Sequence, residues 1–224
     1  MNRKVFIAVL AAMVCQCSQL WAADAPEVTV EGLHRVEGTR LAEVYTDPDA
    51  DFATYNRVML LDAAVAFRKN WLRDQRLQSV DRMRVTSSDV EKIKKNLAEL
   101  FHEVFTKALQ DAGYEVTDEA AEDVLLIRPA IVNLDINAPD TMSAGRSRSY
   151  TQSAGEMTLY VEAYDSVTGD LLAKAIDRKA DRYSSHYTWT NSVTNRAAAT
   201  RVLEGWAEIL VNALNEAHAG KSDS

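Results

Sequence analysis

Apolar residues recur at three- and four-residue spacing over residues 88–112, the pattern of a helix buried along one face. Ser88 followed by Glu91 matches a capping box at its start. Gly113 is the residue type that most readily takes the left-handed backbone at a helix end. The pattern therefore predicts an amphipathic helix with both ends marked.

A second stretch with the same spacing covers residues 199–217, with Asn191 or Ser192 as its expected N-cap. Both helices are predicted to pack on one core. The residues expected to be buried between the helices and the rest of the protein are Leu100, Phe101, Val104, Trp206 and Leu210.

Shorter apolar runs predict strands. Arg57–Phe67 is apolar on both faces and indicates an interior strand, although its length leaves a helix as an alternative. Tyr114–Thr117 indicates a short strand and Asp123–Ile136 a long one, while residues 26–46 hold at most one short strand. Pro129 cannot donate a ladder hydrogen bond, so the long strand is expected to be at an edge there or to bend at a bulge.

The C-terminal half contains an antiparallel hairpin pattern. Met157–Tyr164 alternates apolar and polar residues, Asp165–Asp170 has turn composition with Gly169, and Leu171–Arg182 follows. We expect two paired strands joined by this turn.

A polar segment, residues 137–156, precedes the hairpin and is predicted to be a long surface loop. Arg146, Arg148 and Tyr150 form a basic and aromatic group on an acidic protein, and such side chains are enriched where proteins bind each other. They are the candidate partner-binding residues. A plain connector is the alternative, because lengthening a loop costs little free energy.

These elements predict an α+β fold: a two-layer sandwich in which a mixed, mostly antiparallel sheet carries two amphipathic helices on one face. Residues 23–220 are expected to form a single domain, because about two hundred residues suffice for one core.

The N-terminus has the parts of an export signal: positive charge at Arg3 and Lys4, an apolar run Val5–Cys15, and small residues at Ala22 and Ala23. The apolar run is shorter than the roughly twenty residues that span a bilayer. Residues 1–22 are therefore predicted to be a cleaved signal peptide, which indicates a periplasmic protein with no transmembrane segment after cleavage.

The only two cysteines, Cys15 and Cys17, raise a lipoprotein alternative, in which one of them becomes the acylated first residue. Val14 and Gln16 precede them, whereas lipid attachment requires a small residue there. The unacylated product is favoured, and it has no disulfide and no thiol nucleophile.

The charge balance argues against nucleic acid as a partner. The chain has 25 basic and 33 acidic residues, and loss of Arg3 and Lys4 leaves 23 against 33, a net charge of −10. The basic group Lys92, Lys94 and Lys95 lies beside acidic residues on a predicted helix, which is typical of a solvated face.

No motif indicates a metal or cofactor. The histidines at positions 34, 102, 186 and 218 lack ligand-pair spacing and are interpreted as surface residues. Asp165, Ser166, Thr168 and Asp170 invite a calcium site, but a hairpin turn explains them better, because Asp and Ser bond their own backbone in turns.

Catalytic candidates are equally weak. Acid–base or hydrolytic catalysis would draw on Asp62, Asp135 or the serine-rich loop at residues 137–156. A buried carboxylate at Asp62 would suit proton transfer, but a solvent-facing position is commoner, and no nucleophile elbow or phosphate loop occurs. A junction cluster, Tyr183, His186, Tyr187 and Trp189, could stack on a glycan, yet aromatic residues there usually cover the end of a core.

The order of several segments resembles the domain-of-unknown-function family 3313, a family of Gram-negative envelope proteins that are often lipoproteins. The likeness spans nearly all of the chain after the signal and implies a periplasmic or outer-membrane-associated location, with no implied activity. It is carried by Gly32-Leu33, Tyr55–Phe67 with Trp71, Ala112-Gly113-Tyr114, Leu126–Ile131 and Tyr164–Asp170.

The function expected from these features is that of a non-enzymatic binding or accessory module of the envelope with a protein partner. A periplasmic hydrolase or glycan-binding enzyme is the alternative.

Overall fold

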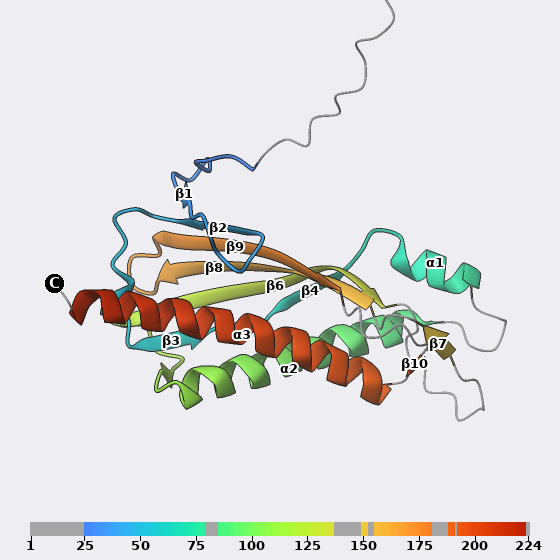
Figure 1. The fold of residues 1–224 in the computed structure, drawn as a ribbon. Helices are drawn as coiled ribbons and strands as arrows, with labels where there is room; N and C mark the ends of the chain where they lie inside the picture. Colours follow the sequence, from blue (N-terminus) through green and yellow to red (C-terminus); the bar gives the residue numbers. More distant parts are fainter. Residues whose placement is uncertain are drawn as a thin grey trace, which may run out of the picture.

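The computed structural model describes residues 25–78, 85–136, 149–151, 155–180, 188–190 and 192–222. Over these residues the chain forms a mixed sheet and three α-helices, an α+β fold (Figure 1). The sheet has eight strands in the order β1-β2-β9-β8-β6-β3-β5, with β4 also paired to β6. Its strands are β1 (His34–Arg35), β2 (Glu43–Thr46), β3 (Arg57–Leu60), β4 (Ala64–Phe67), β5 (Glu115–Val116), β6 (Val124–Ile136), β8 (Gly155–Asp165) and β9 (Leu171–Ala180).

β6 organises the sheet, because it pairs antiparallel with β8 on one side and parallel with β3 and β4 on the other. The prediction of one continuous strand over Arg57–Phe67 is wrong, since residues 61–63 separate β3 from β4. The amide of Leu61 donates to the carbonyl of Ile127, so the backbone polar groups of Ile127 point toward residues 61–63. Pro129 lies two residues further along the strand, so its backbone nitrogen and carbonyl point to the same side. Pro129 is thus paired on one side only, which makes it a local edge position.

The helices α2 (Ser87–Asp111) and α3 (Ser192–Ser222) lie on the same side of the sheet and contact each other (Figure 1). Leu100, Phe101 and Trp206 are buried, as predicted. Val104 and Leu210, which were expected to be buried, are only partly so and pack against the margin of the core. The amphipathic pattern therefore identified the correct faces and overestimated their width.

The N-terminal cap of α2 differs from the prediction. Thr86 is the N-cap, and its side chain accepts from the Asp89 amide at 3.2 Å while Asp89 accepts from the Thr86 amide at 2.8 Å. The capping box thus lies two residues before the predicted Ser88 and Glu91, because Thr86 and Asp89 offer the same reciprocal chemistry. At the other end Gly113, with φ 93°, follows the helix as predicted.

A third helix, α1 (Trp71–Gln78), was not predicted, because its apolar residues do not share one face. A one-turn 3-10 helix, η1 (Phe52–Thr54), precedes β3. Short helices with few apolar residues leave little periodicity to detect.

The predicted loop at residues 137–156 is wrong in part. A short strand, β7 (Ser149–Thr151), lies within it and pairs antiparallel with β10 (Thr188–Thr190), and β8 already begins at Gly155. Such pairing depends on a segment distant in sequence, which local composition does not reveal. The hairpin prediction is confirmed, because β8 and β9 pair antiparallel around the turn at residues 166–170.

Candidate functional site

A row of polar side chains crosses the face of the sheet opposite α2 and α3. Arg128, Glu162, Lys174, Tyr45 and Arg35 are successive register partners on β6, β8, β9, β2 and β1. Register partners project to the same face of a sheet, so these five residues form one line of side chains. Its first three members are Arg128, Glu162 and Lys174, so each charge lies next to a charge of the opposite sign.

Glu162 is the second member of this row and is buried, with 7% of its surface exposed. Its Oε1 accepts from the Tyr160 hydroxyl at 2.7 Å, and its Oε2 accepts from the Tyr164 hydroxyl and from Arg128 Nε, each at 2.8 Å. Burial raises the pKa of Glu162, but the bonds to the two tyrosines and Arg128 outweigh it, so the net pKa lies below its usual value. We call Arg128, Tyr160, Glu162 and Tyr164 the Glu162 cluster.

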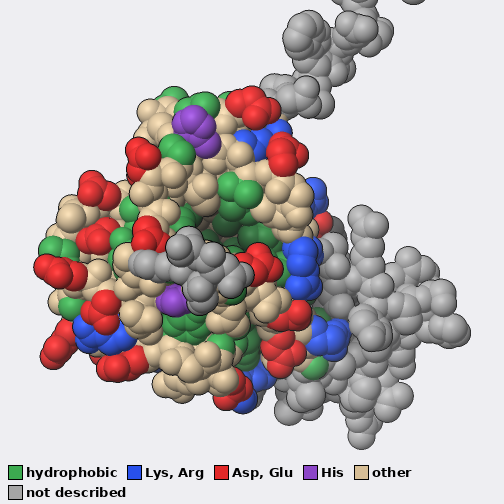
Figure 2. Space-filling model, turned by 60° about the vertical axis from the view of Figure 1, so that its left-hand side comes forward, with side chains coloured by type: hydrophobic (Ala, Val, Ile, Leu, Met, Phe, Trp, Pro, Cys, Tyr) green, Lys and Arg blue, Asp and Glu red, His purple; other side chains and the backbone are tan. Residues whose placement is uncertain are grey.

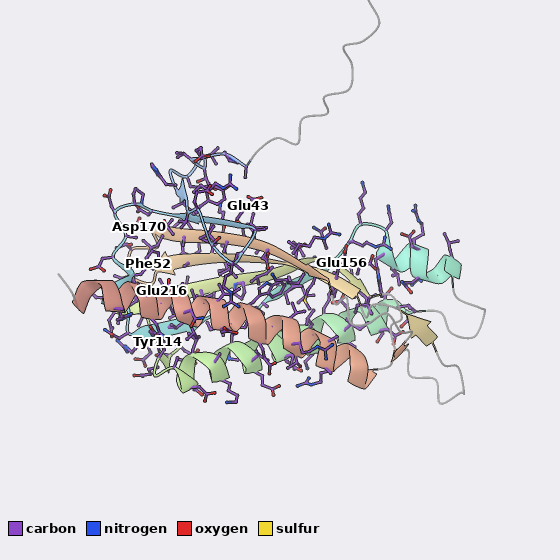
Figure 3. The ribbon with its side chains drawn as sticks, viewed as in Figure 1. Glu43, Phe52, Tyr114, Glu156, Asp170 and Glu216 are labelled. Carbon is purple, nitrogen blue, oxygen red and sulfur yellow. The ribbon has the colours of Figure 1, made fainter. Side chains whose placement is uncertain are left out.

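Lys174 continues the row toward the N-terminal segment. Its Nζ donates to Glu31 at 2.8 Å, and this bond raises the pKa of Lys174 and lowers the pKa of Glu31 to about 2. Tyr45 donates to Glu43, which Figure 3 labels beside β2. The segment before β2 is thereby tied to this sheet face.

The pKa shifts in the Glu162 cluster keep its side chains in one state of charge near neutral pH. Besides the lowered pKa of Glu162, burial followed by the hydrogen bond to Glu162 raises the pKa of Tyr160 and of Tyr164. A general acid or base works best with a pKa near the operating pH, and these shifts lead away from neutrality. The Arg128 guanidinium lies 5.2 Å from the centre of the Tyr164 ring, so the exposed part of the cluster is a cation resting on an aromatic ring.

A second arrangement lies at the end of the sheet where the β8–β9 turn meets the loop after β2. A hollow of about 470 Å³ is lined there by a group of carboxylates, Glu31, Asp47, Asp49, Asp51, Asp165 and Asp170. Figure 2 shows this end of the molecule, with Asp and Glu side chains spread over its surface.

Several carboxylates of this hollow, among them Asp47, Asp51 and Asp165, accept hydrogen bonds from neighbouring groups. Asp165 Oδ1 accepts from the amides of Val167 and Thr168, and its Oδ2 accepts from Tyr55 at 2.9 Å. Burial, then this bond, raises the pKa of Tyr55 to about 12. Within the described part of the chain no three His, Cys, Asp or Glu side chains are arranged to hold a metal ion.

The partner-binding residues predicted from the sequence are only partly placed. Arg146 and Arg148 lie outside the described residues, and Tyr150 lies in β7. Its register partner in β10 is Trp189, so the structure brings together the backbones of two separately predicted contact regions. The other members of the aromatic cluster, Tyr183, His186 and Tyr187, are outside the described residues.

The weaker catalytic candidates occupy the periphery. Asp62 lies between β3 and β4 with its side chain 94% exposed, and its Oδ1 is 3.8 Å from His102 Nδ1, which is too far for a hydrogen bond. Asp135 accepts from Arg68 at 2.6 Å. The exposed His34 and the partly buried His218 do not converge with them, and His186 is outside the described residues.

Sequence reasoning missed the Glu162 cluster, although the strand that carries it was predicted. The apolar residues of β8 were used to define its buried face, while the opposite face reads Thr158, Tyr160, Glu162 and Tyr164. Two tyrosines that flank a glutamate at alternate positions of a strand are the signal that was available, because they must project together.

A model of the family described as "Protein of unknown function (DUF3313)" matches residues 28–210. The chain belongs to this family. The resemblance stated from the sequence is thereby confirmed.

The solved structures that match this protein in fold share little sequence with it. A DUF330 protein from Xanthomonas campestris is 13% identical with a TM-score of 0.40, and the match covers 80% of this chain and 94% of that one. A PelC dodecamer from Paraburkholderia phytofirmans is 10% identical with a TM-score of 0.36, covering 72% and 93%. No curated protein matches the chain. Among the described helices, none is long and apolar enough to cross a membrane.

Proposed function

We propose that this DUF3313 protein is a non-enzymatic accessory module of the Gram-negative envelope that binds a protein partner through the sheet face carrying the Glu162 cluster. The observation that carries the proposal is the hydrogen bonding of Glu162, whose two oxygens accept from two tyrosines and an arginine. These bonds fix the orientation of the carboxylate and lower its pKa, so Glu162 is a weak base that is better suited to shaping a surface.

The composition of this surface supports binding. Tyrosine and arginine are enriched at the energetic centres of protein interfaces, because they combine a large contact area with a polar group. The side chain of Arg128 is 58% exposed, so it remains available to a partner. In a two-layer sandwich the helices cover one face of the sheet, which leaves this face as the broad surface on which a partner can lie.

The location rests on the N-terminal segment. The charged, apolar and small-residue parts of residues 1–22 support export and cleavage, so the mature protein is expected to begin at Ala23 or Asp24 without lipid. Intact-mass measurement of the exported protein tests this expectation. A mass that starts at Cys15 or Cys17 with a diacylglycerol adduct would identify a lipoprotein instead.

Site-specific photocrosslinking in intact cells tests the binding face. A photoreactive amino acid replaces Arg128 on the proposed face or, as the control, Glu103, which is 67% exposed on α2. The expected result is a discrete crosslinked product from position 128 and none from position 103. Equal products from both positions, or none from position 128, would contradict the proposed face.

The segment with Arg146, Arg148 and Tyr150 remains a prediction for partner contact. Replacing Ser143 to Ser153 by a Gly-Ser linker of equal length is expected to leave the core intact and to reduce crosslinking from position 128. Unchanged crosslinking would mean that the segment is only a connector.

A further inference from the structure

The outward face of α1 consists of two leucines and two arginines. At 100° per residue, Leu72, Arg73, Arg76 and Leu77 occupy the half of the helix opposite Trp71, and the same four residues line a shallow depression. The side chain of Leu77 is 79% exposed, and Arg73 and Arg76 are exposed as well. Leu72 is partly buried, and burial in the protein does not account for the exposed Leu77.

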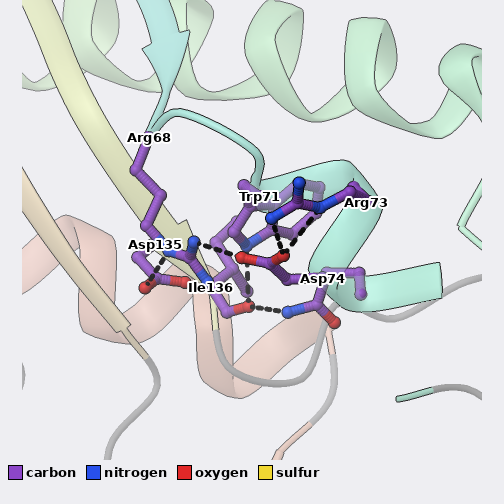
Figure 4. Close-up of polar contacts among 7 residues, drawn as sticks. Arg68, Trp71, Arg73, Asp74, Asp135 and Ile136 are labelled. Carbon is purple, nitrogen blue, oxygen red and sulfur yellow. Dashed lines mark hydrogen bonds and ion pairs between the residues drawn. The ribbon is translucent and has the colours of Figure 1, made fainter. Parts of the chain in front are cut away.

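The inward face of α1 is firmly held (Figure 4). Trp71 is 1% exposed and stacks on Phe67, and the Trp71 indole and the Gln75 amide both donate to the Ile136 carbonyl at 3.3 Å. Arg68 bridges Asp74 and Asp135, at 2.7 and 2.6 Å. The outward face is thus presented on a fixed helix, so little conformational entropy is lost when it binds.

Charge at this face is opposite to that of the chain as a whole. The chain carries a net charge of −8, yet exposed side chains on and beside α1 include Lys69, Arg73 and Arg76. The carboxylates around Asp165 and Asp170 lie at the other end of the sheet from α1 (Figures 1 and 3). An anionic surface would attract the α1 end and repel the far end, which orients the molecule.

We propose that α1 is a docking helix for an anionic phospholipid membrane. Leu72 and Leu77 enter the boundary between headgroups and acyl chains, while Arg73, Arg76 and Lys69 contact lipid phosphates, as interfacial helices do. With so short a helix the binding is weak and reversible. It is also salt-sensitive, because the screening length shortens as salt rises.

Vesicle sedimentation tests the proposal with protein that begins at Ala25, so that no acyl chain on Cys15 or Cys17 contributes. Its fold is verified first by circular dichroism. We expect it to bind vesicles of equal parts phosphatidylglycerol and phosphatidylcholine several-fold more than vesicles of phosphatidylcholine alone. Raising the salt from about 0.05 to about 0.3 M should abolish most of this difference.

The R73Q/L77S double variant should reduce binding about fivefold or more, since each basic contact alone contributes about that factor. R40Q/V167S is the matched control, because it removes one arginine and one exposed apolar side chain away from α1. The control should bind within about twofold of the parent, which is less than the effect of one basic contact.

Equal losses in both variants, or no preference for the anionic vesicles, would overturn the proposal. Salt-sensitive binding to polyglutamate without vesicle binding would also overturn it and would indicate an acidic protein segment as the occupant. The Glu162 cluster is a separate surface, so its crosslinking to a partner succeeds or fails independently of these results.

Discussion

Two buried carboxylates on neighbouring strands, Asp177 of β9 and Glu162 of β8, have different kinds of partners. Asp177, 5% exposed, accepts from the Trp206 indole of α3 at 2.7 Å and from the Ala42 amide before β2 at 3.1 Å. Glu162, 7% exposed, accepts from side chains of its own sheet, those of Tyr160, Tyr164 and Arg128. The first joins two layers of the fold, and the second joins residues already aligned by the strand ladder.

The two carboxylates therefore hold different parts of the protein together. A buried carboxylate costs free energy unless it is paired, and Asp177 offsets that cost through its ion pair with Lys179 and through the bond that attaches α3 to the sheet. The partners of Glu162 lie on the face that α2 and α3 leave open, so its pairing fixes the shape of a surface. The contacts that stabilise the fold therefore lie on the helix side, and the proposed binding surface lies on the open side.

Trp206→Ala should have the largest effect on stability. It removes a 2%-exposed ring from the core and leaves Asp177 without its indole donor, so a loss of about 3–5 kcal/mol of unfolding free energy is expected. Urea denaturation measures it. Trp206→Phe keeps one aromatic ring in the core while it removes the indole donor, so it should cost less than Trp206→Ala. An unchanged midpoint for Trp206→Ala would refute the predicted helix face.

Glu162→Ala is expected to cost less, about 1.5–3 kcal/mol, because it removes charge-assisted bonds and leaves two tyrosine hydroxyls without an acceptor. Glu156→Ala is the control on the same strand and face, where Glu156 pairs with the exposed Arg178 and the expected loss is at most about 1 kcal/mol. Equal losses would show that burial of Glu162 has no energetic consequence. Urea denaturation of the two variants measures both losses of unfolding free energy.

The pH dependence of stability sharpens the same contrast. Because the folded pKa of Glu162 lies below its ordinary value of 4.5, its contribution is complete above pH 4.5 and is lost as the pH falls through the folded pKa. The difference in unfolding free energy between the parent and Glu162→Gln should therefore stay constant from neutral pH to about pH 5 and shrink below pH 4.5. A difference that persists unchanged at the acid end would contradict the assigned ionic state.

Gly205→Ala should give the smallest effect, with the opposite sign. Gly205 lies inside α3, and a Cβ there would meet nothing within 4 Å, so the variant should gain about 0.5–1 kcal/mol. Gly155→Ala in β8 should instead destabilise, because its φ is 152° and a Cβ would lie 2.2 Å from the Asp135 carbonyl oxygen. Thermal unfolding of both variants checks the pair. A loss of stability in Gly205→Ala would contradict the open space that the structure shows around this position.

The elements whose signals are local can be identified from the amino-acid sequence alone. The spacing of Phe101 and Trp206 identified the buried faces of α2 and α3, Gly113 marked a helix end, and the turn at Gly169 identified the β8–β9 hairpin. Segments in family order likewise identified DUF3313. The helix and turn signals depend on neighbours within a few residues, which is the range over which backbone geometry and side-chain periodicity act. The family likeness depends instead on the order of segments along most of the chain.

Which polar groups meet depends on how distant segments of the chain pack together. The row from Arg128 through Glu162 to Lys174 requires strands β6, β8 and β9 to lie side by side in one register, and a shift of one residue would turn every side chain to the other face. The same holds for Arg68, whose two acidic partners come from β6 and α1. Pairing between distant segments depends on the packing of the whole core, so the candidate surfaces are visible only once the chain is folded.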